Sequence, residues 1–232
     1  MGLPLNLAMT PAEMFSAKAL PEKIAWMACH FSPYGEGLTN IPDLLPAGSM
    51  LILNDRMPCQ GHSSDLAAHQ LNDAVSRLDC ESVLLDFQRP PDAESEAMAE
   101  AIVRALSCPA AVPVHYAEKL GCPVFLPPAP LHVPLEEYLR QYQEQEIWLE
   151  AALCQETICV TASGTAYSPQ LPPDGLTGGH YDDILCCQYL TKIAPDEVRF
   201  TLFDTLQTLS RKLEQAQTLG AVRAVGLYQQ LG

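Results

Sequence analysis

The sequence predicts one α/β domain, a small and irregular (β/α)8 barrel that spans residues 1–232. Three observations predict this class. Eight short apolar runs recur along the chain, helical patterns lie between several of them, and neither an internal repeat nor a linker divides the sequence. The length of 232 residues and the apolar fraction of 48% suffice for a single barrel with a sizeable core.

The eight runs are continuously apolar, which is typical of parallel strands that are buried on both faces. They cover residues 24–31, 50–54, 83–87, 112–115, 124–126, 147–151, 184–190 and 222–228. Two further strand-like runs, 157–161 and 198–203, closely follow predicted core strands and are interpreted as hairpin additions. The Pro/Gly-rich stretch 168–179 is expected to form an exposed loop.

Capping residues predict helices between these runs. Ser64 and Asp92 are N-cap residue types, and each precedes an amphipathic pattern. Pro134 suits the first position of a third helix. Thr205 begins a fourth, which Gly220 ends as a C-cap glycine. Each helix precedes a predicted strand, and this order is the rhythm of βαβ units.

Charge and cysteine usage limit the partners and the compartment. The 28 acidic and 13 basic residues give a net charge of -15, which repels phosphate backbones and anionic lipid. We therefore expect neither nucleic acid nor a membrane as a partner. The nine cysteines form no C-x-x-C pair, and the N-terminus lacks the pattern of a signal peptide, so we expect reduced thiols in the cytoplasm. No spacing typical of a metal site is present, and no cofactor is expected.

Functional side chains of a parallel barrel gather at the carboxyl ends of its strands. Alternation along 83–88 places Leu84, Asp86 and Gln88 on one face of a predicted core strand. Asp86 is the most informative of these, because an isolated buried carboxylate is costly and has to be paired, hydrogen-bonded or solvated. Two interpretations stay open, a carboxylate in a pocket and a structural aspartate that accepts hydrogen bonds.

The segment ESVLLDFQ, residues 81–88, resembles the third-strand signature D-G-x-D-x-D-x-E of family-18, chitinase-like glycoside hydrolases. Segment 203–220 resembles the aspartate and amphipathic helix that precede the last strand in that family. Segment 221–232 resembles the last strand itself, which ends in an aromatic residue at the floor of the sugar site. The resemblance implies a glycosidase-like barrel.

The resemblance matches Glu81 to the first acid of the signature, Ser82 to the glycine, Leu84 to the middle aspartate, Asp86 to the penultimate aspartate and Gln88 to the catalytic glutamate. In that family the glutamate protonates the leaving oxygen, and the aspartate orients the substrate's acetamido group, which acts as nucleophile. Gln88 cannot replace the acid, because an amide has no proton to give at a useful pKa. The resemblance thus implies that hydrolysis by this route is absent or very weak.

The first hypothesis is a carbohydrate-binding protein or a glycosidase that is divergent or inactive. Asp86, Gln88 and Tyr228 would hold a small carbohydrate by hydrogen bonds and stacking. Further ligand-binding candidates are His30, His115, Tyr189 and Gln229.

The second hypothesis is an active glycoside hydrolase with relocated carboxylates, drawn from Asp55, Asp86, Glu118 and Glu150. Of these, Asp86, Glu150 and Asp55 are the catalytic candidates. The third hypothesis is a non-catalytic interaction module, which would show a collapsed pocket and a large exposed apolar patch.

Overall fold

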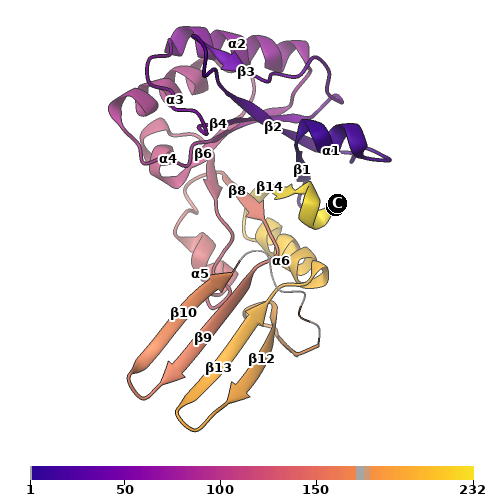
Figure 1. The fold of residues 1–232 in the computed structure, drawn as a ribbon, viewed down its shortest axis with the longest axis vertical. Helices are drawn as coiled ribbons and strands as arrows, with labels where there is room; N and C mark the ends of the chain where they lie inside the picture. Colours follow the sequence, from indigo (N-terminus) through magenta and orange to yellow (C-terminus); the bar gives the residue numbers. More distant parts are fainter. Residues whose placement is uncertain (1, 171–175, 177) are drawn as a thin grey trace.

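The computed structural model describes residues 2–170, 176 and 178–232. Eight parallel strands close into a barrel, because β1 pairs with both β14 and β2 (Figure 1). In barrel order the strands are β1 (Leu5–Met9), β2 (Ile24–Phe31), β4 (Met50–Asn54), β5 (Ser82–Asp86), β6 (Ala110–Pro113), β7 (Val124–Leu126), β8 (Ile147–Ala151) and β14 (Ala221–Leu227). A short strand, β3 (Leu38–Thr39), pairs antiparallel with β2. The predicted barrel class is confirmed.

The helices follow the capping residues of the sequence. They are α1 (Pro11–Ser16), α2 (Ser64–Arg77), α3 (Ala93–Ala105), α4 (Val114–Leu120), α5 (Leu135–Arg140), α6 (Leu206–Thr218) and α7 (Tyr228–Leu231). Asp92 and Thr205 are N-caps as predicted, and Gly220 follows α6 with φ of +100°. The N-cap of α2 is Ser63, one residue before the predicted Ser64. Among the helices of the described residues, none has the length and hydrophobicity needed to cross a bilayer.

Seven of the eight predicted strands lie in the barrel, and one prediction is wrong. The run 184–190 spans a turn and the start of β12 (Cys187–Ile193), which belongs to a separate antiparallel sheet. The eighth barrel strand is instead β1, which is not among the predicted strands. Its apolar run is short and is interrupted by Asn6, a fully buried polar residue. Pairing with the next strand, β2, and with β14 near the other end of the chain stabilises this segment, and no local pattern reveals the pairing with β14.

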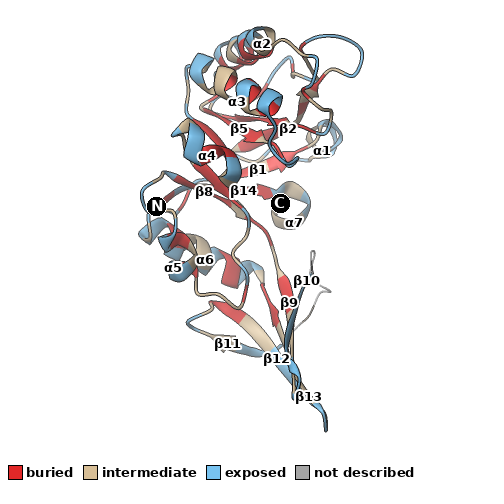
Figure 2. Ribbon diagram, turned by 90° about the vertical axis from the view of Figure 1, so that its left-hand side faces the viewer, coloured by how far each residue is buried: buried red, intermediate tan, exposed pale blue. Residues whose placement is uncertain are grey.

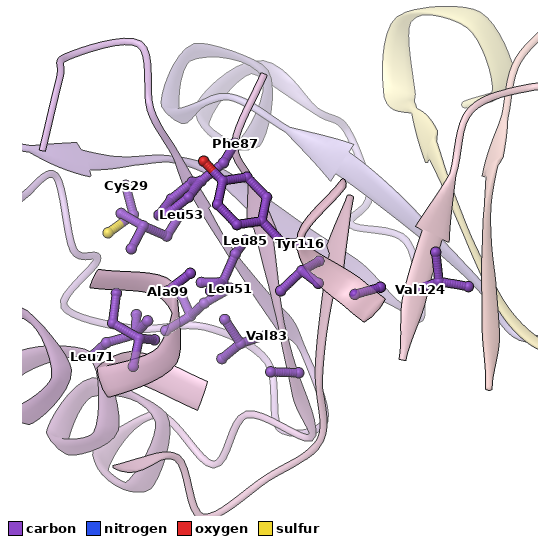
Figure 3. Packing of buried hydrophobic residues seen from close by; sticks show 14 of the residues in the cluster. Cys29, Leu51, Leu53, Leu71, Val83, Leu85, Phe87, Ala99, Tyr116 and Val124 are labelled. Atoms are coloured by element: carbon purple, nitrogen blue, oxygen red, sulfur yellow. The ribbon is translucent and has the colours of Figure 1, made fainter. Parts of the chain in front are cut away.

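The barrel strands are buried on both faces, as their continuous apolar runs predict. Inward-facing residues form a cluster in the barrel interior, which includes Met50, Ile52, Leu84, Phe125, Trp148 and Val225. Outward-facing residues pack beneath the helices: Leu51, Leu53, Val83 and Leu85 lie beside Leu71 of α2 and Ala99 of α3 (Figure 3). Alternate residues of β4 and β5 therefore pack in two places, the barrel interior and the layer between the barrel and the helices.

A second sheet of five antiparallel strands is inserted between β8 and α6. Its order is β10 (Gly164–Gln170), β9 (Gln155–Thr161), β13 (Glu197–Phe203), β12 and β11 (His180–Asp182). It projects away from the barrel (Figures 1 and 2). The predicted additions 157–161 and 198–203 lie in β9 and β13, so their strand assignment is confirmed. Of the predicted loop 168–179, residues 168–170 instead end β10, while 171–175 and 177 lie outside the described residues.

Candidate functional site

The carboxyl ends of the barrel strands surround an open cavity of about 620 Å³. Its floor is apolar and is formed by Met27, Ile52, Leu84, Phe125 and Val225. Its rim is polar and includes His30, Asn40, Asn54, Asp55, Arg56, Asp86, Gln88 and Glu150. Parallel strands bring these side chains together because all eight carboxyl ends meet at one rim. Within the described residues, no group of three His, Cys, Asp or Glu side chains is arranged to hold a metal ion.

Asp86 and Gln88 point into this cavity from the end of β5. The Gln88 Nε2 donates a hydrogen bond to Asp86 Oδ1. Leu84 lies deeper on the same face of the strand, within the apolar interior. Burial raises the pKa of Asp86, and the negative charge of Asp55 adds to the rise, while the Gln88 hydrogen bond opposes it. Asp86 therefore keeps a proton to a higher pH than an exposed aspartate does.

Asp55 is buried and supports the segment that follows β5. Its Oδ1 accepts a hydrogen bond from the backbone N–H of Gln88 at 3.0 Å, and its Oδ2 accepts one from the backbone N–H of Arg89 at 2.8 Å. Both carboxylate oxygens are thus engaged by backbone donors. Asp55 fixes the chain direction that brings Gln88 over Asp86.

Glu150 enters the cavity from β8, three strands around the barrel from β5. Burial raises the pKa of Glu150, and the negative charge of Asp86 raises it further. None of the ion pairs found among the described residues includes Asp86 or Glu150. The negative charges of the two carboxyl groups repel each other, which makes either one a candidate proton donor.

Hydrogen bonds fix the end of β2 at the cavity. His30 Nδ1 lies 2.7 Å from the carbonyl oxygen of Phe31, and Asn40 Nδ2 lies 3.0 Å from His30 Nε2. These contacts hold the imidazole ring in place beside the cavity. Asn40 has φ of +58°, and its carbonyl accepts a hydrogen bond from Trp26 Nε1 at 2.8 Å. Asn54 donates to the carbonyls of Met27 and Cys29, where the β2–β4 register shifts.

Five of the predicted site residues line the cavity together: His30, Asp55, Asp86, Gln88 and Glu150. The other predicted residues do not line it. Tyr228 and Gln229 lie in α7, because β14 ends at Leu227. His115 and Glu118 are exposed on α4, because β6 ends two residues earlier than predicted, at Pro113. Tyr189 lies in β12 of the second sheet, with its ring 5.5 Å from that of His180. The roles assigned to all of these residues stay predictions.

Several residues of the cavity are not predicted from the sequence. Phe125 provides an aromatic ring at the floor, and inward alternation along β7 was the signal that could have found it. Thr10 and Pro11 reach the rim because they follow β1, the strand that was not predicted. Asn40 lies in a loop, and no local pattern places it against His30.

Comparison with known proteins shows likeness in fold. A chitinase from Chromobacterium violaceum has a TM-score of 0.55 at 11% identity, covering 99% of this chain and 94% of that one. A candidate sporulation-specific glycosylase from Bacillus subtilis has a TM-score of 0.54 at 12% identity, covering 87% and 90%. The spore cortex-lytic enzyme SleL from Bacillus cereus has a TM-score of 0.52 at 9% identity, covering 99% and 71%.

No protein-family model and no curated protein sequence matches the chain. The predicted resemblance to chitinase-like glycosidase barrels is confirmed at the level of the fold. Identities of 9–12% do not carry activity or residue roles across, because one fold supports many chemistries.

Proposed function

We propose that the cavity at the strand ends binds carbohydrate, and that the protein hydrolyses glycosides weakly or not at all. The observation that carries this proposal is the Asp86–Gln88 pair, which faces an open cavity above an apolar floor in a glycosidase-like fold. A sugar ring offers C–H faces to an aromatic such as Phe125 and hydroxyl groups to the polar rim.

The surroundings of Gln88 support weak or absent hydrolysis by the chitinase-like route. Gln88 stands where the resemblance expects the proton donor, and its amide group donates a hydrogen bond to Asp86. Leu84 stands where the resemblance expects a supporting acid, and it belongs to the apolar interior. A general acid must transfer a proton, and neither side chain has one to transfer.

The pKa values favour a second candidate function, an active hydrolase that uses Asp86 and Glu150. Both carboxyl groups face one cavity, and burial raises both pKa values. Most glycosidases use two carboxyl groups that flank the scissile bond, and one of them donates a proton. Asp55 is less suited to this role because its oxygens accept backbone hydrogen bonds, and Glu118 lies on α4 outside the cavity.

Calorimetric titration of the full chain with a panel of neutral and amino-sugar oligosaccharides tests the proposal. We expect saturable binding that Asp86→Ala and Phe125→Ala each weaken at least about tenfold, because each removes a contact in the cavity. Thr191→Ala, an exposed change in β12 of the second sheet, is the matched control and leaves binding unchanged. No binding across the panel, or equal binding by the cavity variants and the control, would contradict the proposal.

Chromogenic glycosides separate the two candidate functions. Turnover that Asp86→Asn and Glu150→Gln both abolish supports the active hydrolase. Binding without turnover supports the carbohydrate-binding protein.

A further inference from the structure

The charges around the cavity are unbalanced toward the negative. The titratable and charged side chains that line it are His30, Asp55, Arg56, Asp86 and Glu150. Asp55 is satisfied by two backbone N–H donors, and Arg56 is exposed at the rim. The His30 ring is held by the carbonyl oxygen of Phe31 and the side-chain amide of Asn40. Asp86 and Glu150 therefore remain as half-buried carboxyl groups with no cationic partner among the described residues.

This arrangement favours a cation in the ligand. Two carboxylates in one partly buried site each make the other harder to ionise. A neutral ligand would displace water and leave the repulsion between the carboxylates in place. A positive group between them would instead favour the ionised form of both. An ammonium group suits the position because it carries three N–H donors and no acceptor.

On the basis of the proposed carbohydrate site, we propose that its preferred ligand is a glycan containing an amino sugar whose amine is free and protonated, and that Asp86 and Glu150 receive this ammonium group. The apolar floor with Phe125 takes the ring face, and Gln88 is placed to bind a neighbouring hydroxyl group. N-acetylation removes the charge and two of the three N–H donors, so it removes the preference. Binding declines at low pH as the carboxylates take up protons, and at high pH as the amine loses its proton.

Titration with two ligands of equal length tests this selectivity, a β-linked trimer of glucosamine and a β-linked trimer of N-acetylglucosamine. We expect the full chain to bind the free-amine trimer at least about tenfold more tightly at about pH 6. Glu150→Gln reduces affinity for the free-amine trimer about tenfold and changes affinity for the acetylated trimer less than about twofold.

Glu22→Gln is the matched control because it removes the same charge at an exposed site before β2, at the opposite end of the barrel. It separates local recognition from attraction to the chain's net charge of -15, and it leaves both affinities unchanged. Thermal melting confirms that each variant is folded.

Different results would contradict the preference for a free amine and the carbohydrate site itself. Equal or tighter binding of the acetylated trimer, or equal loss of both ligands in Glu150→Gln, overturns the amine preference and leaves the sugar site in place. Loss of free-amine binding in Glu22→Gln also overturns it, because the attraction would then come from the whole surface. No binding of either trimer or of the neutral panel overturns the carbohydrate site as well.

Discussion

Three carboxyl groups reach the rim of the barrel, and their surroundings give them different capacities. Asp55 gives both oxygens to backbone N–H groups and anchors the segment after β5. Asp86 accepts one hydrogen bond from Gln88, whereas Glu150 has no hydrogen-bond donor within the described residues. The surroundings of each carboxyl group, and not its residue type, make Asp55 a structural anchor and leave Asp86 and Glu150 facing the cavity.

At the residue scale, Glu150→Gln is expected to stabilise the protein near neutral pH. The folded state raises the pKa of Glu150, so the stability that this group contributes is present below its unfolded pKa and is lost as pH rises through its folded pKa. An amide removes the cost of burying the Glu150 charge and, to a lesser extent, its repulsion with Asp86 at neutral pH. We expect the Tm to rise by roughly 2–4 °C at pH 7, the shift that about 1 kcal/mol gives in a chain of this size.

Calorimetry at pH 7 and at about pH 3.5 checks this expectation, because the gain should vanish where both carboxyl groups are protonated. A fall in Tm at pH 7, or an equal gain at both pH values, would show that the buried charge of Glu150 is not the cause.

At the element scale, most helices are determined by signals within a few residues. The Thr205 hydroxyl accepts a hydrogen bond from the backbone N–H of Thr208 at 3.2 Å, and the Thr208 hydroxyl accepts one from the N–H of Thr205 at 2.9 Å. The same helix carries Lys212, whose Nζ lies 2.7 Å from the buried Asp204 Oδ1. The N-terminus of α6 is thus fixed by its own cap and by the ion pair with Asp204, the residue at which the chain returns from the second sheet.

Thr205→Ala is expected to lower the free energy of unfolding by about 1 kcal/mol, because it leaves the N–H of Thr208 without its capping acceptor. Urea denaturation measures the loss as a lower midpoint at an unchanged slope. Thr205→Ser keeps the hydroxyl oxygen and should retain most of the stability. A serine variant as unstable as the alanine variant would argue that the methyl group and not the cap is responsible.

At the scale of the whole molecule, the chain leaves the barrel for the second sheet and returns to it at two adjacent points. The backbone N–H of Asp204 donates to the carbonyl of Cys154 at 2.8 Å, just beyond the ends of β9 and β13. The sheet also contacts the loop after β7, where His132 Nδ1 lies 2.7 Å from Glu156 Oε1. No cavity-lining residue of the described chain comes from 155–203.

Replacement of residues 156–202 by a short Gly-rich turn is therefore expected to leave a folded barrel with ligand affinity within about threefold of the full chain, because the turn need only join two adjacent points. Near-UV circular dichroism and calorimetric titration measure the two properties. A molten or insoluble product would show that the sheet is integral to the barrel. A folded barrel that no longer binds would place part of the site on the sheet.

Local patterns in the sequence determined much of this protein. Continuous apolar runs gave seven barrel strands, capping residues gave the ends of the main helices, and alternation along β5 placed Asp86 and Gln88 together. These features depend on residues a few positions apart, so they can be recognised before the chain is folded.

Only the tertiary structure decided how the barrel closes and which side chains meet. β1 joins the barrel through pairs such as Leu5 with Ala224, while the run 184–190 goes to the second sheet. Glu150 and Asp86 face the same cavity from β8 and β5, and Asp55 holds the backbone after β5. These outcomes depend on pairing between segments far apart in the chain. The packing energy that selects such pairs produces no repeating pattern of residues, so the sequence alone does not reveal them.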